Sequence, residues 1–145
     1  MWNNDKCLEL DRQLCFPMYA ASKEIVRKYT PLLEPLGLTY TQYIVMLVLW
    51  EEEVVTMRDL GDRLYLDSGT LTPLLDKLET KRLIKRSRNE DDERTLDIAL
   101  TKKGIALKEE ARKIPKKIGR CLRLSPREAY ELSTILKKIL KRTSM

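Results

Sequence analysis

The segment from Thr56 to Thr101 constrains the fold of this chain more than any other feature. It begins with a short helical stretch, TMRDLGDRLYL, and continues through turn-forming residues into a second one, DSGTLTPLLDKLETKRLI. It ends with two strand-like stretches around a charged turn, KRSRNEDDERTLDIALT. A helix-turn-helix followed by a charged hairpin has few uses, and most of them involve the major groove of DNA.

Local signals predict where both helices of this segment begin. Thr56 is a good N-cap, and Asp59 lies near the positive end of the first helix dipole. Apolar residues at helical spacing give the first helix a buried stripe of Met57, Leu60 and Leu64. Turn-forming residues follow at Leu66–Gly69, where Asp67 or Ser68 can cap the second helix.

The second helix divides into an inward and an outward face. The inward face consists of Leu71, Leu74, Leu75 and Leu78. The outward face carries small hydroxyls and then charges, namely Ser68, Thr70, Thr72, Asp76, Lys77 and Lys81. Pro73 is expected in about the first turn, where a missing N–H costs little. Hydroxyls and Gly69 allow close approach to bases, and lysines neutralise phosphates. An ordinary helical hairpin with a solvated face is the alternative interpretation.

The strand-like stretches predict a hairpin with a charged tip. Ile84 to Arg88 forms one strand, and Thr95 to Leu100 forms the other, with alternating apolar residues. Four acidic residues lie at the tip, although phosphates would repel them. One resolution is that Asp92 or Glu93 braces Arg94 for insertion into a narrow minor groove, and the other is a solvated acidic turn. The base of the hairpin stays cationic through Lys85, Arg86 and Arg88.

Several of these strings resemble one family. The segment is similar to the winged helix-turn-helix of the MarR family of bacterial transcription regulators, whose wing motif matches Asp92-Glu93-Arg94. Leu100–Gly104 resembles that family's return into a long helix. Leu14-Cys15-Phe16 and the string Leu66–Leu75 resemble the organic-hydroperoxide regulator branch, the OhrR type. The resemblance extends over nearly the whole chain.

The resemblance implies a mainly α fold with a small β-hairpin wing, dimeric through its amino- and carboxyl-terminal helices. The 145 residues form one domain by length, with the winged helix-turn-helix at 39–101 and helical dimerisation regions at 1–38 and 102–145. A formal charge of +6 suits DNA binding that weakens with salt. The expected DNA contacts are Ser68, Gly69, Thr70, Thr72, Pro73, Lys77, Arg86, Arg88, Asp92 and Arg94.

Helical patterns outside the reading segment predict a scaffold. One helix is expected from Leu14 to Lys28, ending before Pro31. A capping box, Thr39-Tyr40-Thr41-Gln42, opens an apolar helix that runs to about Glu51. A long basic helix is expected from Lys102 to about Arg123, with a possible bend near Pro115.

Ser125-Pro126-Arg127-Glu128 opens the last predicted helix, which has an apolar stripe. This stripe consists of Leu132, Ile135, Leu136, Ile139 and Leu140. A symmetric dimer would cover such terminal faces, whereas packing within one chain is the alternative. The apolar run Tyr43–Trp50 is too short to span a membrane, and Met1–Lys6 has no signal-peptide form. We therefore expect a cytoplasmic protein without a membrane partner.

The chain has three cysteines, Cys7, Cys15 and Cys121, and no histidine. An odd, scattered set in a cytoplasmic protein is not a disulfide framework, and its spacing is not that of a zinc site. The missing histidine excludes His-based catalysis, so neither an enzyme nor a metal or other cofactor is expected. A cysteine of this kind is by default a small buried hydrophobe.

Cys15 has further support as a reactive thiol. Tyr19 follows one helical turn later and Tyr29 lies at a similar helical angle, so phenols can favour the thiolate. Because proline is tolerated in a first turn, Pro17 allows a helix that starts near Leu14 and places the thiol at the favourable end of the dipole. A start at Asp11 would instead leave a kink and weaken this argument.

The OhrR resemblance implies that Cys15 is a peroxide sensor whose thiolate is held by tyrosines of the dimer partner, with Tyr29 and Tyr40 as matching positions and Tyr19 nearby. The oxidised sulfur can then pair with Cys121 or with a low-molecular-weight thiol. Cys7 would lie about 12 Å away along a continuous helix, too far to bridge in place.

The sequence thus predicts a homodimeric repressor that binds a pseudo-palindromic operator and releases it when an organic hydroperoxide oxidises Cys15. One alternative is a repressor of the same family released by an aromatic ligand. Another is a small thiol peroxidase, which the absence of histidine and of a Cys-x-x-Cys motif disfavours. The last alternative is a winged helix that serves as a protein-interaction adaptor.

Overall fold

The computed structural model describes residues 5–144 and is mainly α-helical with one small sheet. Met1–Lys6, which were predicted not to form a signal peptide, lie largely outside that range. The helices and strands are α1 Cys15–Leu33, α2 Tyr40–Glu52, β1 Val54–Thr56, α3 Met57–Leu64, α4 Ser68–Thr80, β2 Ile84–Arg88, β3 Leu96–Leu100, α5 Lys102–Ala111, α6 Ile114–Leu122 and α7 Pro126–Thr143. Short 3₁₀ segments are η1 Asp5–Leu8, η2 Leu10–Arg12 and η3 Glu34–Leu36.

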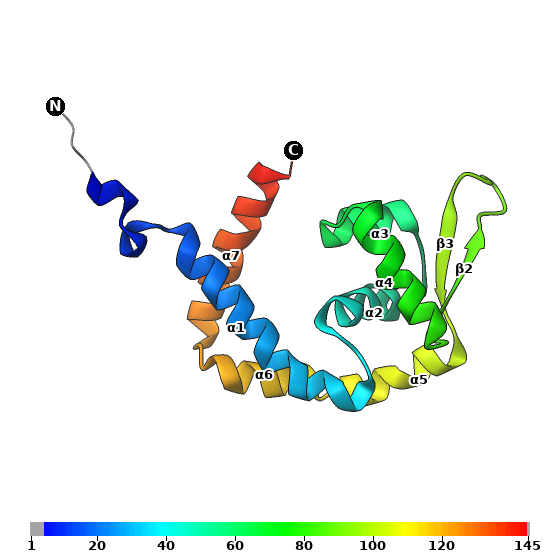
Figure 1. Ribbon diagram of the computed structural model, residues 1–145. Helices are drawn as coiled ribbons and strands as arrows, with labels where there is room; N and C mark the ends of the chain where they lie inside the picture. The colour runs from blue at the N-terminus through cyan, green and yellow to red at the C-terminus, as the bar shows by residue number, and fades with distance from the viewer. Residues whose placement is uncertain (1–4, 145) are drawn as a thin grey trace.

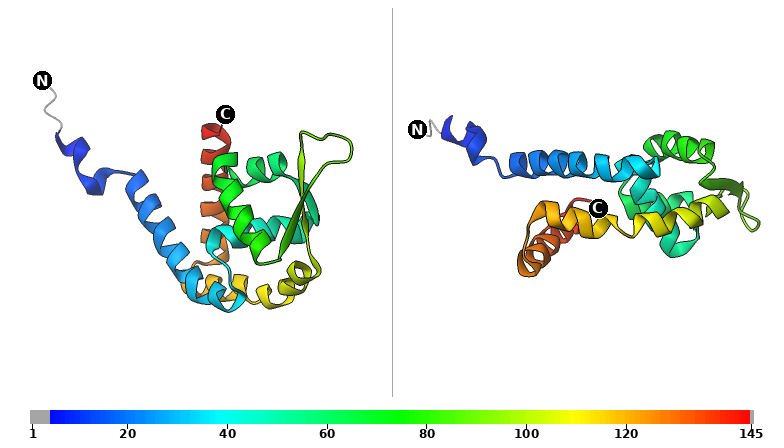
Figure 2. Two further views of the ribbon diagram at one scale, coloured as in Figure 1. Left: turned by 45° about the vertical axis from the view of Figure 1, so that its right-hand side comes forward. Right: turned by 90° about the horizontal axis from the view of Figure 1, so that it is seen from below.

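The chain separates into a reading head and a set of terminal helices (Figure 1). The reading head consists of α2, α3, α4 and the sheet, and its β2–β3 wing projects from one end. Helices α5 and α6 lead away from the sheet, and α1 packs against α6. The further views show that α1 extends well beyond the reading head and that α7 runs in a different direction from α1 (Figure 2).

The core lies inside the reading head, where α2 is buried on almost all sides. The predicted inward face of α4 is confirmed, because all four of its leucines are buried: Leu71, Leu74, Leu75 and Leu78. They pack in one cluster with Met46 and Leu49 of α2, Leu60 of α3 and Ile98 of β3. The recognition-helix candidate is therefore fixed from behind, which leaves its opposite face free.

The sheet has three antiparallel strands in the order β1-β3-β2, rather than the predicted two. The hairpin strands lie where expected, with Arg86 opposite Ile98. The added strand pairs Val54 with Ala99 and leads directly into α3. Three residues are too few for alternation to reveal a strand, so only its partner β3 defines it.

The predicted capping signals are confirmed. Thr56 Oγ1 accepts a hydrogen bond from Asp59 N, and Asp67, rather than Ser68, caps α4 by accepting from Thr70 N at 2.8 Å. Hydrogen bonding by Thr70 lowers the pKa of the Asp67 carboxyl. Both capping boxes form completely, at the start of α2 and at the start of α7. These helix starts are therefore fixed by local chemistry.

Prolines bear on three predicted helices. The first helix does not end before Pro31 but continues to Leu33, since a proline in a last turn removes only one backbone bond. Pro73 lies in the second turn of α4, slightly later than expected. The predicted bend near Pro115 is confirmed as a break between α5 and α6, because Pro115 has no N–H to donate to the preceding turn, so the single long helix is two helices.

Within residues 5–144, no single helix is long and apolar enough to cross a membrane. One bent pair, Cys15–Leu36 with Tyr40–Glu52 at 67°, meets the length and composition criteria only when both parts are taken together. Its second part is the buried core helix α2 of the reading head.

Candidate nucleic-acid interface and thiol site

The exposed face of α4 carries the predicted small polar side chains. Ser68, Gly69, Thr70, Thr72, Pro73 and Lys77 are all exposed. The Thr72 hydroxyl donates to the Ser68 carbonyl at 2.9 Å, so toward a base it can act only as an acceptor while its methyl group stays available for apolar contact. A face of this kind allows close approach to base edges in a major groove.

Gly61 sets how closely the two helices of the reading head approach, a role that the sequence pattern did not indicate. A Cβ at this position would lie 2.7 Å from the Leu66 carbonyl oxygen, in the turn before α4. Tyr65 ends α3 in the left-handed region, with φ at 57°. The close glycine and the sharp turn together place the amino end of α4 beside α3.

Arg86 fastens the wing to α4. Its Nη2 lies 2.6 Å from Asp76 Oδ1 and its Nε lies 2.8 Å from Glu79 Oε2. The hydrogen bond to Glu79, followed by the one to Asp76, raises the pKa of Arg86. The Arg86 side chain is only 24% exposed. Arg86 was predicted as a DNA contact, but in the structure its charge is directed at two protein carboxylates.

The wing turn is held by side chains that bond the backbone. Asn89 Oδ1 accepts from the N–H groups of Asp91 and Asp92, and Asp92 Oδ1 accepts from Arg94 N at 3.0 Å. Arg88 Nη1 donates to the Glu93 carbonyl at 2.8 Å. The prediction that Asp92 or Glu93 braces the Arg94 guanidinium is wrong: among residues 5–144 no ion pair to it forms, and Asp92 shapes the turn that presents it.

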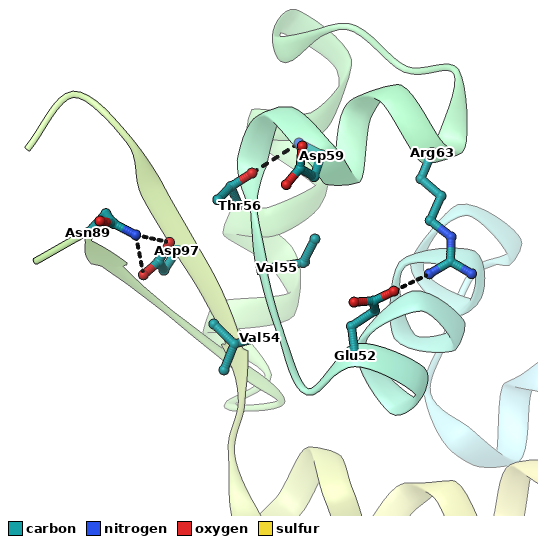
Figure 3. A pocket seen from close by; sticks show the side chains of 8 residues that line it. All are labelled: Glu52, Val54, Val55, Thr56, Asp59, Arg63, Asn89 and Asp97. Atoms are coloured by element: carbon teal, nitrogen blue, oxygen red, sulfur yellow. Dashed lines mark hydrogen bonds and ion pairs between the residues drawn. The ribbon is translucent and has the colours of Figure 1, made fainter. Parts of the chain in front are cut away.

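A cleft of about 440 Å³ lies between the base of the wing and α3 (Figure 3). Asn89 Nδ2 donates to both carboxylate oxygens of Asp97 at 3.1 Å, across the two wing strands. Arg63 of α3 bonds Glu52 at 3.1 Å and Glu51 at 2.5 Å, at the end of α2. Within residues 5–144 no group of three His, Cys, Asp or Glu side chains could hold a metal ion. The walls of the cleft come from α2, β1, α3 and the wing, so it lies entirely within the reading head.

Replacing Arg86 with Gln is expected to weaken DNA binding about 5-fold, because partly exposed ion pairs contribute up to about 1 kcal/mol each and their loss frees the wing. The slope of log affinity against log salt should stay as in the unmodified chain. Operator binding measured by fluorescence anisotropy over a range of KCl concentrations tests this.

A phosphate contact by Arg86 would instead reduce that slope by about 0.9. Arg88→Gln is the matched control on the same strand, since Arg88 is exposed and is a proposed DNA contact. An unchanged slope for Arg88→Gln and a reduced one for Arg86→Gln would reverse the two assignments.

Cys15 is the first residue of α1 and is exposed. Its helix starts near Leu14 as predicted, since the 3₁₀ segment Leu10–Arg12 ends before it, and Pro17 lies in the first turn. Leu14 provides no side-chain cap, so the amino end of α1 is open to an anion such as a thiolate. Cys7 and Cys121 are also exposed, and no cysteine is the buried hydrophobe that its residue type suggests by default.

The predicted tyrosines fall into two groups. Tyr19 lies one turn after Cys15 on α1, with Lys23 Nζ 5.2 Å from its ring centre. Tyr29 lies fourteen residues after Cys15 on the same helix, which is about 21 Å at 1.5 Å per residue. Its ring centre is 4.8 Å from that of Tyr40. The Tyr29–Tyr40 pair is therefore out of reach of the cysteine in the same chain.

The aromatic pair is part of a partly buried cluster with Tyr43, whose ring centre lies 5.7 Å from that of Tyr29. Burial, followed by the neighbouring phenols Tyr40 and Tyr43, raises the pKa of Tyr29 to about 12. Burial also raises the pKa values of Tyr40 and Tyr43. These phenols keep their protons at ordinary pH and are suited to donate hydrogen bonds to an anion.

The terminal helices present apolar side chains to solvent. None of the α7 residues is buried, and the exposed set comprises Leu14, Phe16, Val26, Leu122, Leu124, Leu132, Ile135, Leu136 and Leu140. The amphipathic pattern of α7 thus has no covering partner among residues 5–144. A second copy of the chain would cover these faces.

The chain is similar to known transcriptional regulators. Residues 27–111 match the family described as transcriptional regulator SarA/Rot. The chain is 46% identical over 135 residues to the organic hydroperoxide resistance transcriptional regulator of Bacillus subtilis (strain 168), covering 93% of this chain and 90% of the relative.

Two solved structures of AbfR, a protein of Staphylococcus epidermidis, are also similar. Reduced AbfR bound to DNA has a TM-score of 0.79 at 35% identity, covering 97% of this chain and 99% of that one. Disulfide-formed AbfR has a TM-score of 0.64 at 36% identity, covering 94% and 96%. Both likenesses include the terminal helices as well as the reading head.

Proposed function

Since the chain belongs to the MarR-like winged-helix transcriptional regulators of SarA/Rot type, we propose that it is a homodimeric repressor that releases its operator when an organic hydroperoxide oxidises Cys15. It acts in the cytoplasm, where its DNA is, and it is not an enzyme. Residues 39–101 read the DNA, while 1–38 and 102–145 form the dimer.

The observation that carries this proposal is the separation of the thiol from its proposed partners. Cys15 lies at the open amino end of α1, and the Tyr29–Tyr40 pair lies about 21 Å further along. A thiolate site made of these groups needs two chains, and the exposed apolar helices favour such a dimer. In this proposal the signal acts at the dimer contact, where a chemical change can alter the spacing of the two reading heads.

The reduced dimer presents two copies of α4 to successive major grooves of a pseudo-palindromic operator. Ser68, Gly69, Thr70, Thr72 and Pro73 face the bases, and Lys77 and Arg88 neutralise phosphates. Arg94, presented by the Asp92-shaped turn, enters the minor groove. The chain is more similar to reduced, DNA-bound AbfR than to its disulfide form, which supports the described arrangement as the binding state.

Oxidation of Cys15 proceeds in two steps. The Cys15 thiolate attacks the distal peroxide oxygen, the O–O bond breaks, and an alcohol leaves after protonation while sulfur becomes a sulfenic acid. A second thiol then attacks that sulfur, forming a disulfide and releasing water. Cys121, exposed on α6, or a low-molecular-weight thiol supplies the second sulfur. Cys7 lies in a separate 3₁₀ segment, so the estimate for one continuous helix does not describe it.

Release requires the oxidised dimer to favour a non-binding arrangement. To move the dimer from 1% to 99% free of DNA, oxidation must shift the equilibrium between the binding and non-binding arrangements by about 10⁴-fold, or about 5.5 kcal/mol. A disulfide with a bulky thiol can impose this by preventing the tyrosine contact at Cys15.

The test uses a DNA duplex selected by the reduced dimer from a random pool. Its affinity for the dimer is measured before and after treatment with cumene hydroperoxide, and mass spectrometry identifies the modified cysteines. We expect release together with a modification at Cys15 that reducing agent reverses. Retained binding despite oxidised Cys15 would overturn the proposal.

A second candidate function rests on one cavity. A cleft of about 370 Å³ with mostly apolar walls lies between α2 and the α5–α6 break, bordered by Tyr43, Trp50, Lys108 and Arg112. Glu51 also lines this cleft, and Lys108 donates to the Trp50 carbonyl while Arg112 pairs with Glu109, so an uncharged aromatic compound suits it as the releasing ligand. Release by a phenolic compound, but not by hydroperoxide, would favour this candidate. Turnover of peroxide with a thiol donor would instead indicate a thiol peroxidase, and DNA affinity that is insensitive to salt would indicate an adaptor.

A further inference from the structure

Lys81 links the carboxyl end of the recognition helix α4 to the connection between α1 and α2. Its Nζ donates to the Gln42 side-chain oxygen at 2.8 Å and also to the Gly37 carbonyl. Lys81 follows Gln42 of α2 by 39 residues and Gly37 of the loop after α1 by 44 residues, so both are tertiary contacts.

The acceptor Gln42 is part of the structure that holds Tyr40. Its side chain is 2% exposed, and its Oε1 also accepts from Thr39 N at 3.1 Å to complete the capping box of α2. Tyr40 is the first residue of that helix and lies against Tyr29. A displacement of Tyr40 therefore moves the first turn of α2, and with it Gln42, which accepts the hydrogen bond from Lys81.

The donor side of the contact leads to the parts of the molecule that meet DNA. Lys81 caps α4, and its own carbonyl accepts from Lys103 Nζ at 3.0 Å. Two residues earlier, Glu79 pairs with Arg86 of the wing strand β2. The end of α4 is thus a junction at which the Tyr40 turn, the wing and α5 meet.

We propose that Lys81 is a positioning residue that transmits the state of the Tyr29–Tyr40 pair to the recognition helix and the wing. This inference rests on the proposed function, in which those tyrosines hold the partner's thiolate. When oxidation drives Tyr40 away, the capping turn of α2 shifts, and the bond from Gln42 to Lys81 carries that shift to the end of α4. Without the bond, the reading head keeps its position while the sensor changes.

The test compares unmodified chain, Lys81→Met and Lys85→Met as full-length dimers. Lys85 is an exposed lysine on β2, so its replacement matches the loss of charge. The measured quantity is the ratio of DNA affinity in the reduced state to that after cumene hydroperoxide treatment. Lys81→Met should lower this ratio by about 2- to 30-fold, while its reduced-state affinity matches that of Lys85→Met. A purely structural role would lower both affinities equally and leave the ratio unchanged, which would overturn the inference.

Hydrogen exchange on the unmodified dimer tests the same link without a variant, in case Lys81→Met does not fold. On oxidation, protection should fall together in residues 37–42 and 77–83. A loss confined to 37–42 would refute the transmission through Lys81. If the unmodified dimer does not release DNA at all, the proposed function fails instead, so the two failures are distinguishable.

Discussion

Replacing Cys15 with Ser should leave operator binding intact and abolish release by hydroperoxide. Serine has nearly the same size, and Cys15 is exposed at the start of α1, so no buried contact is lost. The hydroxyl is not a nucleophile toward peroxide at neutral pH, whereas a thiolate is. Fluorescence anisotropy of labelled operator, titrated with cumene hydroperoxide, should show full release for the unmodified chain and none for the variant.

Cys7→Ser and Cys121→Ser are the matched controls, because both cysteines are exposed as well. Cys7→Ser should behave like the unmodified chain. Cys121→Ser divides the possible second steps: retained release with a small added thiol indicates a mixed disulfide, while release lost even in that thiol's presence indicates that Cys121 supplies the second sulfur. Release by Cys15→Ser at the peroxide dose that acts on the unmodified chain would contradict the sensor assignment.

The reading head was largely predictable because its signals are local. Thr56 and Asp67 bond N–H groups within their own first turns, and the leucine pattern of α4 alone identifies the buried face. The second hairpin strand was found because apolar and polar residues alternate along Thr95–Leu100, and the first was placed as its partner across the charged turn. The third strand, Val54–Thr56, was missed because its definition lies in Ala99 and Ile98, far along the chain.

The charged side chains of the wing could be recognised but not paired. Sequence placed Arg86 among the cations at the hairpin base, yet its partners Asp76 and Glu79 belong to α4 and are set by tertiary packing. Asp92 was expected to bond a side chain and instead bonds the backbone N–H of Arg94, two residues away. Such short-range Asx contacts compete well with ion pairs that must order a long, exposed arginine.

The proposed thiol site could be located only in part, because the position of a second chain does not follow from the sequence of one. The position of Cys15 at a helix start followed from Pro17 and was confirmed. Its distance from Tyr29 followed from helix geometry once α1 was seen to be continuous to Leu33. This distance is the reason for the proposal that the pair acts between chains, and the uncovered apolar face of α7 is consistent with such a dimer.

Replacing both Tyr29 and Tyr40 with Phe should slow oxidation of Cys15 about 10- to 100-fold at pH 7. Each phenol that donates to a charged group contributes about 1.5–3 kcal/mol, and 1.36 kcal/mol corresponds to one pH unit. Because only the thiolate reacts, losing both donors moves the rate profile to higher pH by about two to four units. Stopped-flow measurement of the oxidation rate between pH 5 and pH 10 tests this.

The sign of the effect is fixed by the tyrosines themselves. Burial raises the pKa of Tyr29 to about 12, so its phenol stays protonated across the whole range and the profile reports the thiol alone. The variant should therefore be slow at neutral pH and approach the unmodified rate at high pH. Tyr43→Phe is the matched control, since Tyr43 is 3% exposed in the same cluster but has no proposed contact with the partner's thiolate. A loss of rate that is equal at all pH values would mean that the tyrosines shape access to Cys15 rather than stabilise its ionised form.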